Sequence, residues 1–173
     1  MYRKIEDFIN DWEYEAEETL KLFRNLTNES LNKVFHDGHR TLGRLAWHIT
    51  YTLAEMMQTA GLPIEQIASE PESFLAENLV NLYEKEADSV KRMVHRHWVD
   101  EDLPETVPMY GEDWTKGTVL SVLIRHQAHH RGQIYMMLGL LGITTPPIFG
   151  LTEPQVVEAA RQGSPFTDRA SLP

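Results

Sequence analysis

Four long stretches of this chain carry apolar side chains three or four residues apart, and this spacing constrains the fold more than any other feature. An α-helix turns once every 3.6 residues, so such a spacing gathers the apolar side chains on one side of a helix. The first stretch shows the pattern at Ile5, Phe8, Ile9, Trp12, Ala16, Leu20 and Phe23. The sequence therefore predicts amphipathic helices over about residues 5–23, 42–60, 74–98 and 115–141.

Four amphipathic helices without a convincing central strand predict an all-α protein, with a four-helix bundle as its architecture. The 173 residues match one domain, with the bundle over about residues 1–142 and a C-terminal extension over 143–173 that holds a short helix at 154–161. The connections at 61–73 and 99–115 are long enough to cross an end of the bundle, and the second one allows a short extended piece at 106–109. An up-down-up-down topology of the four helices is therefore possible but not required.

Charge and apolar run length limit the partners and the compartment. The chain has 26 acidic and 16 basic side chains, a net charge of −10, which repels phosphate backbones and anionic lipids. The longest nearly apolar run, residues 134–143, is far shorter than the roughly 20 residues of a membrane helix. The first residues also lack the basic and apolar segments of a secretory signal. We therefore expect a cytoplasmic protein that binds neither nucleic acid nor membrane.

The chain has no cysteine, so nitrogen and oxygen atoms must hold any bound metal. Of its eight histidines, His126 and His130 lie four residues apart on the fourth predicted helix, in line with its apolar stripe. Two imidazoles in an apolar stripe need partners for their nitrogen atoms, and one bound cation satisfies both. The alternative is a pair that hydrogen-bonds to each other, to water or to acidic groups.

A third ligand must come from another helix. His48 is the one other histidine well inside a predicted helix and near its apolar side, although a lone histidine in such a place is more often a satisfied core or boundary residue. His129 lies at the edge of the stripe and is less favoured. The remaining histidines, expected in a polar link or at a helix end, are better explained by solvation or helix capping: His36, His39, His95 and His97.

Three neutral imidazoles suit zinc, nickel, iron or copper and leave at least one coordination position for water or substrate. A zinc peptidase is disfavoured, because Gln127 occupies the position where its general base, a glutamate, follows the first histidine. Gly132 within a helix suggests the close approach of another backbone, and the alternative is that the glycine is tolerated there without a role. Gln133 falls near His126 in projection, where it can hydrogen-bond to a ligand. No catalytic residue can be assigned.

These residues resemble a known family. Leu45, His48 and Tyr51, followed much later by His126 and by the run His130 to Gln133, are similar to motifs of the DinB/YfiT-like superfamily of metalloenzymes. The resemblance covers most of residues 1–142. It implies a four-helix bundle, often a homodimer, in which His48, His126 and His130 bind a divalent metal.

The resemblance also suggests what the protein does. Members of that superfamily include transferases and isomerases that use low-molecular-weight thiols such as bacillithiol or mycothiol, which implies a metal that activates the thiol of a cosubstrate. Our first hypothesis is therefore a metal-dependent S-transferase or a hydrolase of a small molecule. The second is a non-catalytic, dimeric metal-binding or stress-response module, favoured if an acidic residue closes the metal site. Trp47 and Tyr51, expected to be exposed, are candidates for a dimer contact.

Overall fold

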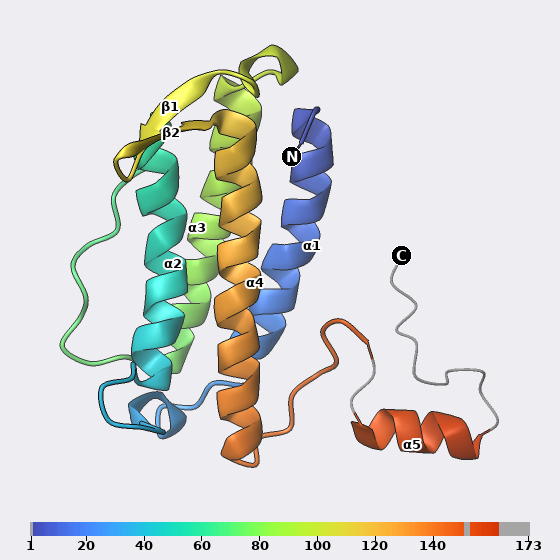
Figure 1. Ribbon diagram of the computed structural model, residues 1–173. Coiled ribbons are helices and arrows are strands. Elements are labelled where there is room, and N and C mark those ends of the chain that lie inside the picture. The colour runs from blue at the N-terminus through green and yellow to red at the C-terminus, as the bar shows by residue number, and fades with distance from the viewer. Residues whose placement is uncertain (1, 151–152, 163–173) are drawn as a thin grey trace.

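The computed structural model describes residues 2–150 and 153–162, and its four long helices form a bundle (Figure 1). These helices are α1 (Ile5–Phe23), α2 (Leu42–Thr59), α3 (Ala76–His97) and α4 (Lys116–Leu140). The shorter elements are η1 (Ser30–Asn32), η2 (Asp100–Asp102), the strands β1 (Thr106–Met109) and β2 (Glu112–Thr115), and the helix α5 (Glu153–Arg161). The all-α four-helix bundle is confirmed, and each predicted helix is found within two residues of its expected ends.

Local signals explain where α2 and α4 begin. The hydroxyl of Thr41 accepts a hydrogen bond from the Arg44 amide at 3.1 Å, and the hydroxyl of Thr115 accepts one from the Thr118 amide at 3.1 Å. Each threonine thereby satisfies an amide that has no partner within the first turn of its helix. Gly142 follows the last turn of α4 with a positive φ of 71°, a conformation that favours glycine and ends the helix.

The bundle does not alternate up and down. Figure 1 shows α2 and α3 running in the same direction, because the chain between them returns along the whole length of the bundle. At the start of α3, the Ala76 amide donates to the Asn28 side chain, which lies just beyond the end of α1. The close neighbours are α1 with α3, α3 with α2, α2 with α4, and α4 with α1. As a result α2 and α4 lie antiparallel to each other, which places the middle of α2 opposite the middle of α4.

Large aromatic side chains fill the interior between α1 and α3. Trp12 is 1% exposed and stacks on Phe8, with 6.0 Å between the ring centroids. Its indole N–H donates to the carbonyl of Ala87 at 2.9 Å, which removes the penalty of burying that polar group. The predicted apolar stripe of α1 therefore faces the core.

The predicted extended piece at 106–109 is strand β1, which pairs antiparallel with β2 in a small hairpin near one end of the bundle (Figure 1). Tyr110 and Gly111 form its two-residue turn, both with positive φ, as such tight hairpins require. The Tyr110 hydroxyl donates to the carboxylate of Glu55 at 2.7 Å and so ties the hairpin to α2. The hairpin is peripheral and leaves the all-α class unchanged.

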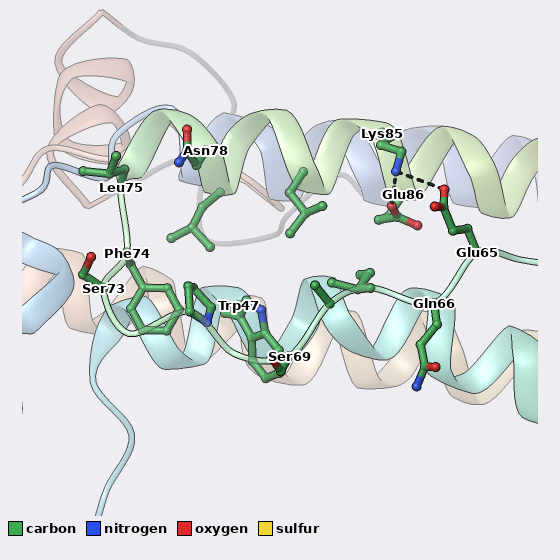
Figure 2. A pocket seen from close by; sticks show the side chains of 15 residues that line it. Trp47, Glu65, Gln66, Ser69, Ser73, Phe74, Leu75, Asn78, Lys85 and Glu86 are labelled. Carbon is green, nitrogen blue, oxygen red and sulfur yellow. Dashed lines mark ion pairs between the residues drawn. The ribbon is translucent and has the colours of Figure 1, made fainter.

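The expectation that Trp47 and Tyr51 are exposed is wrong. Both are half-buried, stack on each other with 4.9 Å between the ring centroids, and pack against the core. Trp47 lines a pocket together with Phe74 and Ile67, which belong to the connection between α2 and α3 (Figure 2). The crossing of this connection over α2 is a tertiary feature, so helix periodicity alone assigned these aromatic rings to the surface.

The chain after α4 contacts the bundle before it reaches α5. The ring of Phe149 lies 5.5 Å from that of Tyr14 and beneath the guanidinium of Arg131 at 5.3 Å. Residues 151–152 and 163–173 of the predicted extension and of the predicted single domain lie outside the described residues. Within residues 2–150 and 153–162, no helix has the length and apolar character that crossing a membrane requires.

Candidate metal centre

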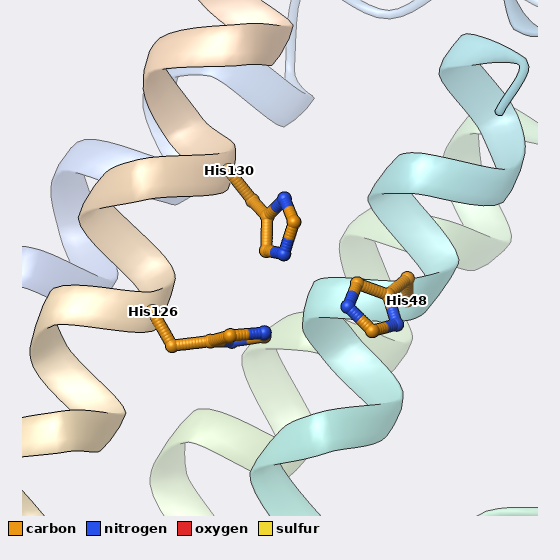
Figure 3. Close-up of side chains that lie close together, drawn as sticks. All are labelled: His48, His126 and His130. Atoms are coloured by element: carbon orange, nitrogen blue, oxygen red, sulfur yellow. The ribbon is translucent and has the colours of Figure 1, made fainter. Parts of the chain in front are cut away.

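Three histidines meet between α2 and α4. His48 projects from α2 toward His126 and His130, which lie one turn apart on α4 (Figure 3). The ring centroids are separated by 5.3 Å for His48 and His126, 4.8 Å for His48 and His130, and 4.5 Å for His126 and His130. These are the three residues that the sequence analysis selected, and the antiparallel packing of α2 on α4 brings them together.

The spacing of the imidazole nitrogens fits a shared metal ion. One nitrogen from each ring lies within 4.8 Å of the others. A tetrahedral zinc ion, with Zn–N distances of about 2.1 Å, holds its nitrogen ligands about 3.4 Å apart. Side-chain rotations that move each nitrogen by about 1 Å therefore suffice to complete a common coordination sphere. Within the described part of the chain, this group contains no carboxylate.

Neighbouring side chains orient two of the rings. The Nδ1 of His130 donates to the Oε1 of Gln133 at 2.7 Å, which leaves its Nε2 free as a metal ligand. The Nδ1 of His126 lies 3.5 Å from the hydroxyl of Thr52, a longer and weaker contact. Gln133 therefore positions a ring of the site, but that ring is His130 rather than the expected His126.

The environment keeps the imidazoles neutral. Burial, together with the positive charges of Arg40 and of neighbouring imidazoles, lowers the pKa of His48 and of His126 to about 4. Burial also lowers the pKa of His130, against a hydrogen bond to Gln133 that raises it. Since only the neutral ring offers a lone pair, these shifts prepare the site for metal at neutral pH.

The same shifts make the metal-free protein sensitive to acid. The unfolded chain takes up protons on His48 and His126 near pH 6.5, whereas the folded chain does so only near pH 4. Stability is therefore lost as the pH falls through this window, by about 2 kcal/mol in total after allowance for the partial exposure of both rings. Urea unfolding of chelator-treated protein at a series of pH values measures the loss. A variant with His48→Asn and His126→Asn serves as the control, and a pH profile as steep as that of the wild type contradicts the prediction.

The other five histidines are exposed. His36 and His39 lie in the connection before α2, and His95 and His97 lie in the last turn of α3. His129 is exposed on α4, and its Nε2 accepts a hydrogen bond from Gln133 at 3.2 Å. None of the five belongs to the group of converging nitrogens. The structure thus places these five histidines outside the three-histidine group, as the sequence analysis expected.

The residues that flank the two α4 histidines hold the helices together. The amide of Gln127, which is fully buried, donates to the Ile49 carbonyl at 2.8 Å and accepts from the Tyr83 hydroxyl at 3.1 Å, so it joins α2, α3 and α4. Arg131 is also buried and forms an ion pair with Glu15 of α1 at 2.5 Å. Both residues serve packing, and neither contacts the three imidazoles through a hydrogen bond.

Gly132 does not provide the close approach that its place in a helix suggested. A Cβ atom added at this position meets nothing within 4 Å. The glycine that does permit close packing is Gly43 on α2, where an added Cβ falls 2.7 Å from the ring of Phe74. The sequence offers no signal for this difference, since the neighbour of Gly43 lies on a connection whose path depends on the tertiary fold.

The fold and the site together define a four-helix-bundle protein with a candidate three-histidine metal centre between two of its helices. The sequence pattern of the DinB family matches residues 1–161. The chain belongs to this family, as its resemblance in sequence predicted.

Individual relatives support the same assignment. The chain is 31% identical over 151 residues to YrdA from Bacillus subtilis strain 168, a match that covers 87% of this chain and 90% of YrdA. It is similar to the crystal structure of a DinB-like protein from Bacillus cereus, with 33% identity and a TM-score of 0.81 over 86% of this chain and 100% of the other. YfiT from Bacillus subtilis shares the fold at 15% identity, with a TM-score of 0.59 over 81% of this chain and 89% of YfiT. YfiT is described as a probable metal-dependent hydrolase with an unusual four-helix bundle topology.

Proposed function

We propose that this protein is a metal-dependent enzyme in which His48, His126 and His130 hold one divalent transition-metal ion, such as zinc, nickel or iron. The observation that carries the proposal is the convergence of three neutral imidazoles from two helices, with nitrogen atoms within 4.8 Å of one another. Three protein ligands without a carboxylate in the group are typical of a catalytic site that keeps a position open. A bound ion supplies Lewis acidity there, which lowers the pKa of a coordinated water or thiol.

The side chains around the site favour a small thiol as the nucleophile. In the described part of the chain, no carboxylate belongs to the histidine group, and Gln127 is hydrogen-bonded within the core. A nucleophile that needs little help in losing its proton suits such a site. A free thiol has a pKa of about 8.5 and water one of about 15.7, so the thiol is the better match. Its proton goes to solvent, its sulfur forms a bond to an electrophilic carbon, and the leaving group departs with its bonding electrons.

Hydrolysis of a small molecule is the second candidate function. It is favoured by the description of YfiT, which shares the fold, as a probable metal-dependent hydrolase. A metal of this kind can lower the pKa of water to about 7, so hydrolysis does not strictly require a carboxylate base. The two functions use the same three histidines and differ in the nucleophile that takes the open position.

Two parallel assays distinguish these functions. The zinc-loaded protein is mixed with 1-chloro-2,4-dinitrobenzene and one of three thiols: bacillithiol, mycothiol or 2-mercaptoethanol. The second assay follows the hydrolysis of 4-nitrophenyl acetate. We expect at least one thiol to react about a hundredfold faster than with chelator-treated protein, and the ester to react at equal rates in both preparations.

The opposite outcomes are equally informative. Metal-dependent ester hydrolysis without thiol transfer identifies the hydrolase. A stoichiometric metal with no turnover in either assay contradicts the enzymatic proposal and supports the non-catalytic, dimeric module. Light scattering of the same preparations measures the oligomeric state and so tests the homodimer that we propose together with either function.

A further inference from the structure

We propose that a cavity beside the three histidines binds a small molecule in which a carboxylate is joined to an apolar body, and that Arg40 binds the carboxylate. The cavity has a volume of about 690 Å³ and lies between residues 35–40, the start of α2 and the second half of α4. This size is typical of pockets for small-molecule ligands. Binding in the cavity is independent of the proposed function. Only the further step, that the bound molecule is a substrate of the metal site, rests on the proposed function.

The cavity adjoins the candidate metal centre directly. His130 and Gln133, which hydrogen-bond to each other, both form part of its wall. Arg40 forms part of the same wall. A molecule held in the cavity therefore lies next to both the metal site and Arg40.

The cavity wall has an unusual charge for this chain. The protein has 26 acidic side chains, yet none of them lines the cavity among the described residues. Arg40 is the single permanently charged group of the wall, accompanied by the imidazoles of His36, His39, His129 and His130. Such a lining attracts an anion locally, although the protein as a whole repels it.

Arg40 is free to bind a ligand. It forms no hydrogen bond or ion pair with any other residue in the described part of the chain. Arg44, one turn further along, is by contrast fully engaged with Glu70 through bonds of 2.8 and 3.2 Å. An arginine binds a carboxylate through two parallel hydrogen bonds, and its one charge balances the one charge of that group. A phosphate monoester, with nearly two negative charges at neutral pH, is matched less well by this wall.

Apolar side chains form the rest of the wall. Leu45 and Met137 lie deeper, whereas Phe35 and Met136 are 39% and 64% exposed. Exposed apolar groups around a cavity are typical of a surface that a ligand covers, and methionine adapts easily to different shapes. The occupant therefore needs an apolar body as well as its anionic end.

Calorimetric titration of metal-free protein tests the proposal without relying on activity. The probes are 4-phenylbutanoate and 4-phenylbutan-1-ol, which match in size and apolar body and differ in charge. We expect the acid to bind at least about tenfold more tightly than the alcohol. Arg40→Gln should weaken binding of the acid about tenfold and leave the alcohol unchanged. Arg44→Gln, the matched control, should affect neither probe.

Three results overturn the proposal: equal binding of both probes by the wild type, no binding of either probe, and equal losses in the two variants. The metal content of wild type and Arg40→Gln is measured separately by mass spectrometry. A protein that holds no metal but binds the acid through Arg40 refutes the proposed function and leaves the carboxylate site intact. A protein that holds metal but binds both probes equally refutes the carboxylate site and leaves the proposed function intact.

Discussion

Replacing His126 with alanine is expected to lower the metal content from about one equivalent to below about 0.1 equivalents after purification without chelators. His126 supplies one of three converging nitrogens, and its ring lies 4.5 Å from that of His130 and 5.3 Å from that of His48. Two imidazoles alone bind a divalent ion far less tightly than three. Mass spectrometry of the purified variant measures the metal, and activity in the thiol or ester assay should disappear with it.

A second measurement separates loss of the metal from loss of the fold. A ligand that binds only the folded protein at a hundred times its dissociation constant stabilises it by about 2.7 kcal/mol. We expect zinc at a hundred times its dissociation constant to raise the free energy of unfolding of chelator-treated wild type by about this amount, and to have no effect on chelator-treated His126→Ala. His129→Ala is the matched control, because His129 is the exposed neighbour on the same helix. Full metal content in His126→Ala excludes His126 as a ligand. Absence of metal from the purified wild type refutes the metal centre.

Changing Gln127 to glutamate is expected to destabilise the protein by about 3–4 kcal/mol at neutral pH. The Gln127 amide donates to the Ile49 carbonyl at 2.8 Å inside the core, whereas a carboxylate there places two acceptor oxygens against each other. The new carboxyl group escapes this repulsion only by keeping its proton, so its pKa rises above that of the unfolded chain. The penalty therefore grows as the pH rises above about 4.3 and shrinks in acid.

Urea unfolding followed by circular dichroism at several pH values measures this effect. Gln58→Glu is the matched control, since Gln58 is exposed on α2 and the same chemical change there should alter stability by less than about 0.5 kcal/mol. Equal stability of Gln127→Glu and the wild type contradicts the role of Gln127 in joining three helices. Gln127 does not take the place of the glutamate base of a zinc peptidase, because its hydrogen-bond partners are Ile49 and Tyr83.

Local patterns predicted the elements of the fold well. The helix spacing and the place of His126 and His130 on one side of α4 both depend on residues within one or two turns of each other. Helical hydrogen bonds and side-chain spacing act over this same range, so the sequence carries the information directly. The family resemblance added His48 as the third ligand, which periodicity alone left open.

Predictions that needed neighbours from distant parts of the chain were less successful. Trp47 was assigned to the surface because the path of the α2–α3 connection was unknown, and Gln133 was placed near His126 because projection ignores side-chain length and direction. No local sequence pattern points to Arg40. It lies in a connection, and its importance follows only from the cavity wall and from its lack of a partner among the described residues.

The sequence by itself determined four amphipathic helices, the absence of thiol ligands, and two histidines one turn apart on the inner side of the last long helix. Only the tertiary structure decided that α2 and α4 are antiparallel neighbours, so that His48 meets two residues about 80 positions later in the chain. The reason is physical: helix formation is governed by nearby residues, whereas the choice of neighbours depends on how the long connections cross the bundle. The same packing buries the imidazoles, lowers their pKa and brings Arg40 into the wall of the cavity that His130 also lines.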